Sequence, residues 1–216
     1  MKLRLTKIAI FLAALIPLAR LVWKYLHDGL GANPIEFITH ATGDSTLILI
    51  LATLSITPLR RITRQYWLIG VRRMVGLFAF FYGTLHFLTY IWLDKFFDIH
   101  EMLKDIAKRP FITIGFSAFV LMIPLTLTST AWSIRRLGGK NWQRLHRLIY
   151  FTGILAVVHY AWLVKADLRK PIEYGVVLSI LLLYRVGVWA SEKISEKRKQ
   201  PAIPAPAASR TEATKA

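Results

Sequence analysis

Residues 71–90 read VRRMVGLFAFFYGTLHFLTY, a stretch that opens with basic side chains and continues as an apolar and aromatic run. About 20 such residues, at about 1.5 Å of rise each, cross the hydrocarbon core of a membrane as a helix. One histidine, His86, lies deep in this run. An ionisable side chain is costly at that depth, so it marks a candidate functional site. The stretch therefore predicts a membrane-spanning helix that carries a functional histidine.

Five other stretches of the 216-residue chain have the same apolar character. Together with the first they predict six spans, at roughly 8–26, 43–58, 74–93, 111–131, 147–164 and 172–190. The second is short and is expected to extend past both edges. The first continues to about Leu26 without a small-residue cleavage site, so it is expected to remain as a span rather than act as a signal peptide. Because lipid offers no partner to an open sheet edge, we expect an all-α membrane protein built as a six-helix transmembrane bundle.

The chain is both apolar and strongly basic: 55% of its residues are hydrophobic and its formal net charge is +17. A nucleic-acid-binding protein can be as basic, but long apolar runs would not separate its charges. Here the basic residues cluster between alternate spans, which is typical of cytoplasmic loops and predicts that both termini are cytoplasmic. The clusters are Lys2, Arg4 and Lys7; Arg60, Arg61, Arg64, Arg72 and Arg73; Arg135, Arg136, Lys140, Arg144 and Arg147; and Lys193, Lys197, Arg198 and Lys199.

The chain contains no cysteine, which excludes disulfides, iron–sulfur clusters and covalently attached haem. A metal or a haem would have to be held by His, Met or oxygen ligands. The C-terminal stretch from Lys199, KQPAIPAPAASRTEATKA, is rich in Pro and Ala and cannot build a core. We therefore expect a transmembrane domain at 1–195 and a disordered Pro/Ala-rich cytoplasmic tail at 196–216.

Depth singles out two of the six histidines. His86 lies 12 residues after Met74, and His159 lies 12 residues after Arg147. Both helices are predicted to run outward, so both histidines lie about 18 Å from the inner edge. Two imidazoles at one level on parallel helices can hold opposite faces of one haem, an arrangement that suits electron transfer because the iron keeps no open position. The alternative is a pair of buried histidines hydrogen-bonded to backbone or water.

A third histidine, His146, precedes His159 by 13 residues, which is roughly 20 Å along a helix and would suit a second redox centre. That spacing turns about 220° on a regular helix, so the pair shares a face only if the helix is frayed or distorted. His146 could instead be an interfacial residue. Arg72 and Arg73 could bind haem propionates or a flavin phosphate, or could simply anchor the topology. The remaining histidines, His27, His40 and His100, are expected near the surface.

Five stretches carry a resemblance to a known family. They are GLGANP (29–34), LATLSITPLRR (51–61), the opening stretch (71–90), KRPFITIGF (108–116) and WQRLHRLIYFTGILAVVHYAW (142–162). In this order they resemble the MsrQ (YedZ) family, the haem-binding membrane subunits of periplasmic protein-methionine-sulfoxide reductase systems. The resemblance covers nearly the whole chain except the tail. It implies a ferric reductase-like transmembrane domain in the bacterial inner membrane.

The resemblance also implies cofactor ligands. In the wider relatives, the ferric reductases and NADPH oxidases, two histidines on the third helix pair with two on the fifth to hold an outer and an inner haem. By that resemblance His86 and His159 would bind the outer haem b, and His146 would be the inner fifth-helix ligand. The inner third-helix position, 14 residues before His86, is Arg72. This departure implies an inner site that holds either a differently ligated second haem or FMN, with His146, Arg72 and Arg73 around it.

The function that the resemblance implies is electron transfer rather than substrate chemistry. No flavin or nicotinamide domain and no dinucleotide-binding glycine motif follows the sixth span, so electrons are expected from the quinone pool or a cytosolic flavin reductase. They would pass to MsrP, the periplasmic molybdenum-containing subunit that reduces methionine sulfoxide in oxidised envelope proteins. Two other hypotheses stay open: a stand-alone ferric or quinone reductase of the same architecture, and a cofactor-free transporter or scaffold whose histidines handle protons or pack.

Overall fold

The computed structural model describes residues 2–164 and 167–199, and every regular element in those ranges is helical. The long helices are α1 (Lys2–Leu26), α2 (Pro34–Thr63), α3 (Ile69–Leu88), α5 (Pro110–Leu127), α8 (Leu148–Val164) and α9 (Arg169–Lys199). Shorter pieces join them: the 3₁₀ turn η1 (Tyr66–Leu68), the π-helical turn η2 (Thr89–Asp94), α4 (Ile99–Lys108), α6 (Ala131–Leu137) and α7 (Gly139–His146).

Six segments of the described residues are long and apolar enough to cross a membrane, which confirms the predicted all-α bundle. The second segment, Pro34–Thr63, extends past both predicted edges as expected. The fourth is shorter than the predicted 111–131, because α5 ends at Leu127, where the Thr128 hydroxyl donates to Pro124 O and closes the last turn. Helix α9 continues to Lys199, and the rest of the predicted tail, 200–216, lies outside the described residues.

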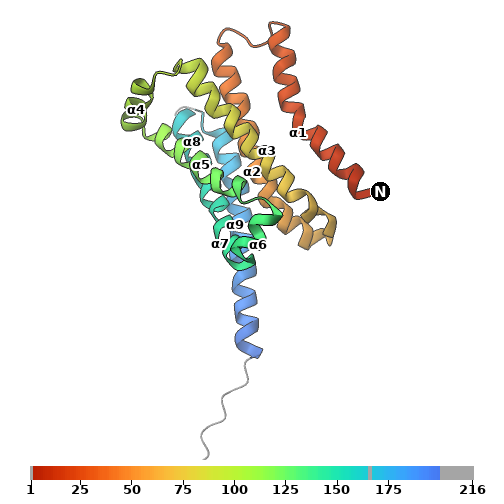
Figure 1. The fold of residues 1–216 in the computed structure, drawn as a ribbon. Coiled ribbons are helices and arrows are strands. Elements are labelled where there is room, and N and C mark those ends of the chain that lie inside the picture. The colour runs from red at the N-terminus through yellow and green to blue at the C-terminus, as the bar shows by residue number, and fades with distance from the viewer. Residues whose placement is uncertain (1, 165–166, 200–216) are drawn as a thin grey trace, which may run out of the picture.

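The turns and short helices that connect the long helices lie at the two ends of the bundle (Figure 1). Helix α2 packs most extensively against α3, and α5 packs most extensively against α8, while α1 leans on the edge formed by α2 and α3. The α1–α2 turn and α4 lie at one end, and the α2–α3 turn, α6 and α7 lie at the other. We call the latter the basic end. It carries Arg60, Arg61, Arg64, Arg72, Arg73, Arg135, Arg136, Lys140, Arg144 and Arg147. Its assignment to the cytoplasm, and that of both termini, stays a prediction.

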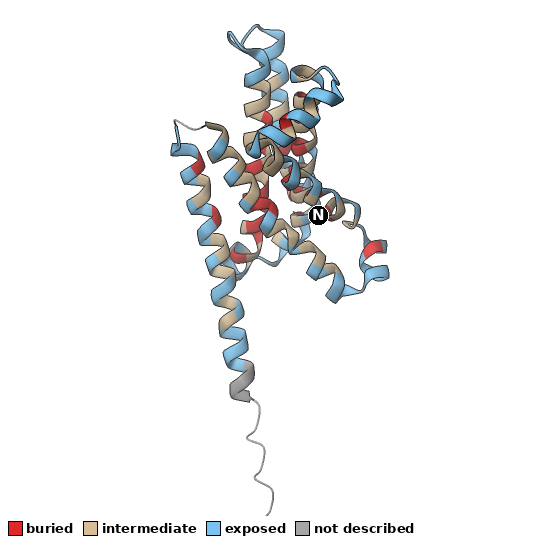
Figure 2. Ribbon diagram, turned by 90° about the vertical axis from the view of Figure 1, so that its left-hand side faces the viewer, coloured by how far each residue is buried: buried red, intermediate tan, exposed pale blue. Residues whose placement is uncertain are grey.

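Buried residues concentrate along the middle of the bundle, and its outer surface is exposed (Figure 2). The main core cluster consists of Leu47, Ile50, Leu51, Leu54, Ala79, Met122 and Leu178. Large apolar side chains point outward, and Leu12, Phe151 and Ile180 are 59%, 59% and 61% exposed. An apolar surface this extensive is rare on a soluble monomer, whereas lipid tails solvate it readily. The chain is a multi-pass membrane protein.

Tyr82 of α3 fastens α1 to the bundle. Its hydroxyl donates to Ala14 O at 2.8 Å and accepts from Leu18 N at 3.1 Å, and the residue is 1% exposed. These two backbone groups would bond each other in a regular helix, so the hydroxyl is inserted into the hydrogen-bond ladder beside Pro17. The insertion satisfies both groups in a place where lipid supplies no partner.

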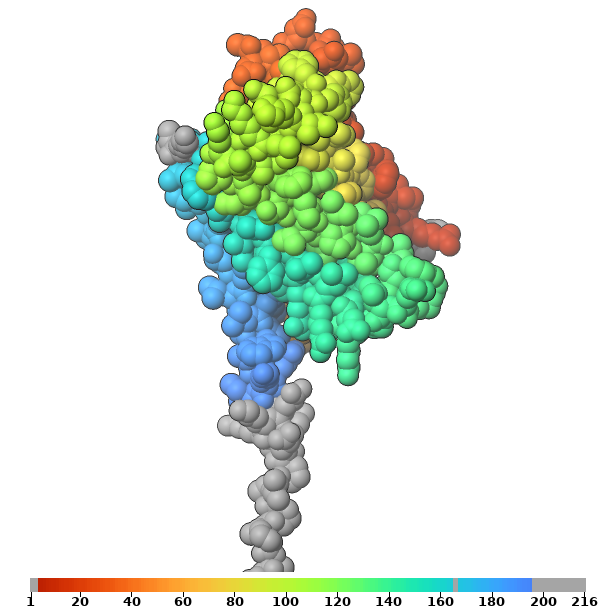
Figure 3. All heavy atoms as spheres, turned by 60° about the vertical axis from the view of Figure 1, so that its left-hand side comes forward, coloured from red at the N-terminus to blue at the C-terminus, as the bar shows by residue number. Residues whose placement is uncertain are grey.

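Beyond η2 the chain folds back into the short amphipathic helix α4, which covers part of one end of the molecule (Figure 3). Lys95 Nζ lies 2.7 Å from Asp105 Oδ2, and both side chains are 11% exposed. Arg109 Nε adds a contact of 3.3 Å to Asp105 Oδ1. The hydrogen bond to Asp105 raises the pKa of Lys95. Burial alone would raise the pKa of Asp105, but Lys95 and Arg109 outweigh it and hold that pKa below its ordinary value. The ion pairs therefore tie α4 to the end of the third span.

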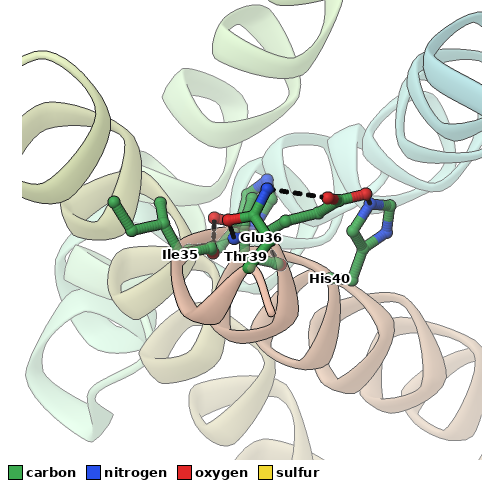
Figure 4. A network of polar contacts seen from close by, with 6 residues as sticks. Ile35, Glu36, Thr39 and His40 are labelled. Carbon is green, nitrogen blue, oxygen red and sulfur yellow. Dashed lines mark hydrogen bonds and ion pairs between the residues drawn. The ribbon is translucent and has the colours of Figure 1, made fainter. Parts of the chain in front are cut away.

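The start of α2 is fixed by a set of local polar contacts (Figure 4). Asn33 caps the helix: its Oδ1 accepts from Glu36 N at 3.2 Å, and its Nδ2 donates to Glu36 Oε2 at 2.9 Å. Glu36 Oε1 also lies 3.8 Å from His40 Nε2, and the Thr39 hydroxyl donates to Ile35 O at 2.8 Å. These contacts set where α2 begins, and so they set which of its carbonyls face α3 one turn later.

We expect Tyr82→Phe to lower the stability of the full chain in detergent by about 1–3 kcal/mol, since it removes the partner of two buried backbone groups. Thermal melts followed by circular dichroism measure the change. Tyr25→Phe is the matched control, because Tyr25 lies on α1 and is 67% exposed. An equal loss in the two variants would show that the inserted hydroxyl contributes nothing.

Candidate histidine site

His86 on α3 and His159 on α8 face each other inside the bundle. Their ring centroids are 6.1 Å apart, and the ring planes meet at 77°. The arrangement follows from equal depth on two helices that run in the same direction. The structure thus brings together the two histidines that the depth argument selected.

Each ring is held by a backbone carbonyl of a helix other than its own. His86 Nδ1 lies 3.0 Å from Thr39 O of α2, and His159 Nδ1 lies 2.7 Å from Phe111 O of α5. A carbonyl can only accept, so each Nδ1 carries the hydrogen and donates it. Each Nε2 is then the unprotonated nitrogen, which is the form in which imidazole binds a metal. The hydrogen bond from Nδ1 also fixes the orientation of each ring.

A glycine lies four residues after each accepting carbonyl: Gly43 on α2 and Gly115 on α5. A Cβ at Gly43 would lie 3.2 Å from the His86 ring, and a Cβ at Gly115 would lie 2.7 Å from the His159 ring. The two helices approach the histidines this closely only because these positions lack a side chain. Sequence reasoning found neither glycine. The available signal was a glycine within a predicted span, and that signal does not say which side chain packs against it.

The pair fits the axial ligands of a haem. Two metal–imidazole bonds of about 2 Å in line place the two nitrogens about 4 Å apart, with each ring centre slightly behind its nitrogen. The observed 6.1 Å between centroids is close to the separation expected of two imidazoles bound to one metal ion. Among the described residues, no group of three His, Cys, Asp or Glu side chains is placed to hold a metal. The other coordination positions would have to come from a macrocycle, as in haem.

The surroundings of the pair are apolar and aromatic. Phe111 lies beside His159, with ring centroids 6.3 Å apart. Phe87 follows His86 in the chain and packs on Phe116 and Phe119 of α5, at centroid distances of 5.7 Å and 4.7 Å. The π-helical turn η2 begins three residues after His86, and such wider turns are frequent at functional sites. A flat hydrophobic group would find matching walls here.

His146 lies at a break in the fifth span. Helix α7 ends at His146 and α8 begins at Leu148, and between them Arg147 N bonds to Arg144 O in a tight turn. The spacing between His146 and His159 required a frayed or distorted helix, and this break is such a distortion. The two histidines therefore belong to different helical segments.

The His146 ring already has partners. It stacks on Trp142 with centroids 3.9 Å apart, and its Nε2 lies 3.0 Å from Thr128 Oγ1. That hydroxyl gives its own hydrogen to Pro124 O, so His146 Nε2 must be the donor. Ligation through Nε2 would require this hydrogen bond to break, whereas Nδ1 keeps its lone pair. This is a different situation from that of His86 and His159.

The two arginines that enter the third span lie in different surroundings. Arg72 is half-buried and its charge acts on His146, whereas Arg73 is exposed. The structure thus brings Arg72, but not Arg73, toward His146. The remaining histidines lie outside this site: His27 and His100 are exposed, and His40 is half-buried beside Glu36.

The fold and this site define a class of protein: multi-pass helical membrane proteins with two facing histidines at the centre of the bundle. Residues 41–157 match the family described as ferric reductase like transmembrane component. The chain is 56% identical, over 197 residues and 90% of each chain, to the protein-methionine-sulfoxide reductase heme-binding subunit MsrQ of Herminiimonas arsenicoxydans. The chain therefore belongs to the MsrQ family of ferric reductase-like transmembrane proteins.

Other members of this family are similar over comparable lengths. The MsrQ subunit of Bordetella pertussis is 53% identical over 182 residues, which cover 83% of this chain and 88% of the relative. The MsrQ subunit of Xanthomonas campestris pv. campestris is 45% identical over 205 residues, which cover 92% of this chain and 94% of the relative. No solved structure matches the chain significantly.

We expect Gly115→Ala to destabilise the chain by about 1–3 kcal/mol, because the new Cβ would overlap the His159 ring and push α5 away from α8. Gly175→Ala is the control, since its Cβ would lie 3.6 Å from Val157 Cγ1, an ordinary contact. Both variants gain the same helix propensity. Thermal unfolding of the full chain in detergent compares them, and equal midpoints would show that His159 does not limit the approach of α5.

Proposed function

We propose that this protein is a haem-binding electron-transfer subunit of the bacterial inner membrane. It passes electrons across the membrane to a periplasmic molybdenum-containing methionine sulfoxide reductase, MsrP, which repairs oxidised periplasmic proteins. The chain performs no substrate chemistry of its own. The observation that carries the proposal is the facing pair His86 and His159, each with Nδ1 bonded to a carbonyl and Nε2 free.

In this proposal His86 and His159 would hold a haem b at the outer side of the bundle. The haem supplies an iron that changes oxidation state without an open coordination position. The residues of the chain supply the other requirements of the site. The carbonyls of Thr39 and Phe111 hold both rings in one tautomer, so neither has to reorient when an electron arrives. Phe111 beside His159 and Phe87 next to His86 give the pair apolar neighbours.

A second redox centre lies toward the basic end in this proposal, with His146, Arg72 and Arg73 around it and either a second haem or FMN as its occupant. His146 ends α7 about 20 Å along the span from His159, a separation that supports two centres in series across the membrane. The half-buried Arg72 is the nearer of the two arginines. The guanidinium group suits a haem propionate or a flavin phosphate, since it binds either oxyanion bidentately.

The chain needs partners on both sides of the membrane. The relatives are named heme-binding subunits of protein-methionine-sulfoxide reductase, which supports a separate catalytic subunit as the electron acceptor. We propose the quinone pool or a cytosolic flavin reductase as the electron donor, acting at the basic end. The bacterial sources of the relatives fit the inner membrane as the location.

We expect His86→Ala and His159→Ala each to lower the haem content of the purified protein and to weaken its Soret band and reducible α-band, because one imidazole holds the iron from one face only. Absorption spectra of the oxidised and dithionite-reduced full chain measure this, with haem content from a pyridine haemochrome assay. His100→Ala is the control, since His100 is exposed on α4 and lies outside the histidine site. A full haem complement in both His86→Ala and His159→Ala would refute the ligand assignment.

We also expect the reduced haem to be reoxidised only when its partner is present. The full chain is reconstituted in liposomes and reduced, and MsrP and methionine sulfoxide are then added while the α-band is followed. Its decay should require both additions, because the chain itself offers no site for the substrate. Equally rapid decay with ferric citrate or a quinone and without MsrP would favour a stand-alone reductase. A purified chain without any Soret band would favour a transporter or scaffold instead.

A further inference from the structure

Three arginines from three different helices meet at the basic end: Arg60 of α2, Arg72 of α3 and Arg185 of α9. The charges of Arg60 and Arg185 both act on Arg72, and all three residues are half-buried. Arg185 lies within the predicted sixth span and was not singled out from the sequence. A charged residue inside a span was the signal that could have found it.

Several hydrogen-bond donors of this cluster have no acceptor. Arg185 is fixed by bonds from Nη2 to Leu54 O at 2.7 Å and from Nη1 to the Tyr150 hydroxyl at 2.9 Å. The Nε atoms of Arg60 and Arg185 are nevertheless buried without a hydrogen-bond partner, and so is Thr57 Oγ1. Thr57 lies three residues before Arg60 on the same face of α2. Unpaired buried N–H and O–H groups that lie together call for an acceptor.

No protein carboxylate supplies that acceptor. Within the part of the chain that the structure describes, no ion pair involves any of the three arginines, whereas the neighbouring Arg61 pairs with Glu192 at 3.1 Å. Like charges gathered in a membrane-embedded bundle repel one another, and a buried cation without a partner is strongly destabilising. Simple topology anchors would instead extend into water at the membrane surface.

A small groove opens beside the cluster. It has a volume of about 180 Å³ and is lined in part by Thr57, Tyr150 and Arg185, with Arg61 and Glu192 also on its wall. Pockets that hold a whole drug-sized ligand measure roughly 300–1,000 Å³. This groove is large enough for a phosphate group and its ester link but not for an entire flavin. The Tyr150 hydroxyl, which accepts from Arg185, keeps its own hydrogen for a further acceptor.

We propose that Arg185, Thr57 and Tyr150 bind a phosphate group in this groove, and that Arg60 and Arg72, which do not line it, add positive charge nearby. Phosphate offers several acceptor oxygens and more negative charge than one carboxylate, which matches three guanidinium groups. The phosphate has two possible sources: the monoester of FMN, or the headgroup of an anionic lipid. The FMN source rests on the inner centre of the proposed function, whereas the site itself does not.

The test uses the full chain in nanodiscs of phosphatidylcholine, titrated with FMN and with riboflavin, which lacks the phosphate. Binding is followed by quenching of flavin fluorescence. If FMN is the source, it should bind at least about 10-fold more tightly than riboflavin, and Arg60→Gln and Arg185→Gln should each weaken FMN by about 10-fold or more while leaving riboflavin unchanged. Arg64→Gln is the control, because Arg64 is exposed at the basic end and does not line the groove.

A second arm replaces part of the phosphatidylcholine with phosphatidylglycerol. If a lipid phosphate is the source, phosphatidylglycerol should raise the thermal midpoint of the wild-type chain and of Arg64→Gln, but not that of Arg60→Gln or Arg185→Gln. Either result supports the phosphate site and identifies the source. The proposal is overturned if FMN and riboflavin bind alike and phosphatidylglycerol stabilises all four proteins equally. A second haem lost from Arg60→Gln and Arg185→Gln, with FMN binding unchanged, overturns it as well.

The Soret band of the His86/His159 haem is recorded in every sample. A normal band shows that the Arg60→Gln and Arg185→Gln variants are folded. The band also separates the phosphate-site proposal from the proposed function. The phosphate site can fail while the outer haem is present, and the outer haem can be absent while the phosphate site binds.

Discussion

An imidazole N–H that is buried among membrane-spanning helices must find an acceptor inside the protein, because lipid offers none. His86 and His159 both meet this constraint by donating to a carbonyl on a neighbouring helix. The donation dictates much of the surrounding structure. It leaves each Nε2 unprotonated, and it requires a second helix to pass directly over the ring. Gly43 and Gly115 are needed for that approach.

The two ends of the bundle differ in electrostatics, and the proposed electron path uses that difference. The histidine pair lies in apolar, aromatic surroundings, where two neutral rings can hold an iron without further charge. The basic end gathers arginines whose buried donors are unpaired, which favours negatively charged groups there. His146 lies between these environments, stacked on Trp142 and bonded to Thr128 at the end of α5. One chain thus has a pair of facing imidazoles within the bundle and a group of arginines at the basic end.

The sequence was sufficient for the six spans, because length and hydropathy largely determine what crosses a membrane. It was also sufficient to pair His86 with His159, because equal rise along two parallel helices gives equal depth. It could not identify Gly115, since a glycine's role depends on which side chain packs against it. Nor could it separate Arg72 from Arg73, because the positive-inside pattern explains both equally well until burial is known. The sequence predicted a break near Arg147 only as the condition under which His146 and His159 could share a face, since no Pro or Gly marks the break.

His86 and His159 meet their carbonyl partners at different times during biosynthesis. His86 is oriented by α2, which packs closely on α3, so this contact exists once the third span has left the translocon. His159 and its partner α5 are joined only when α8 has been made. The nascent chain therefore carries one oriented imidazole while the opposite one is still being translated. In the proposed function, the pair that would hold the cofactor is therefore complete only after α8 has been made.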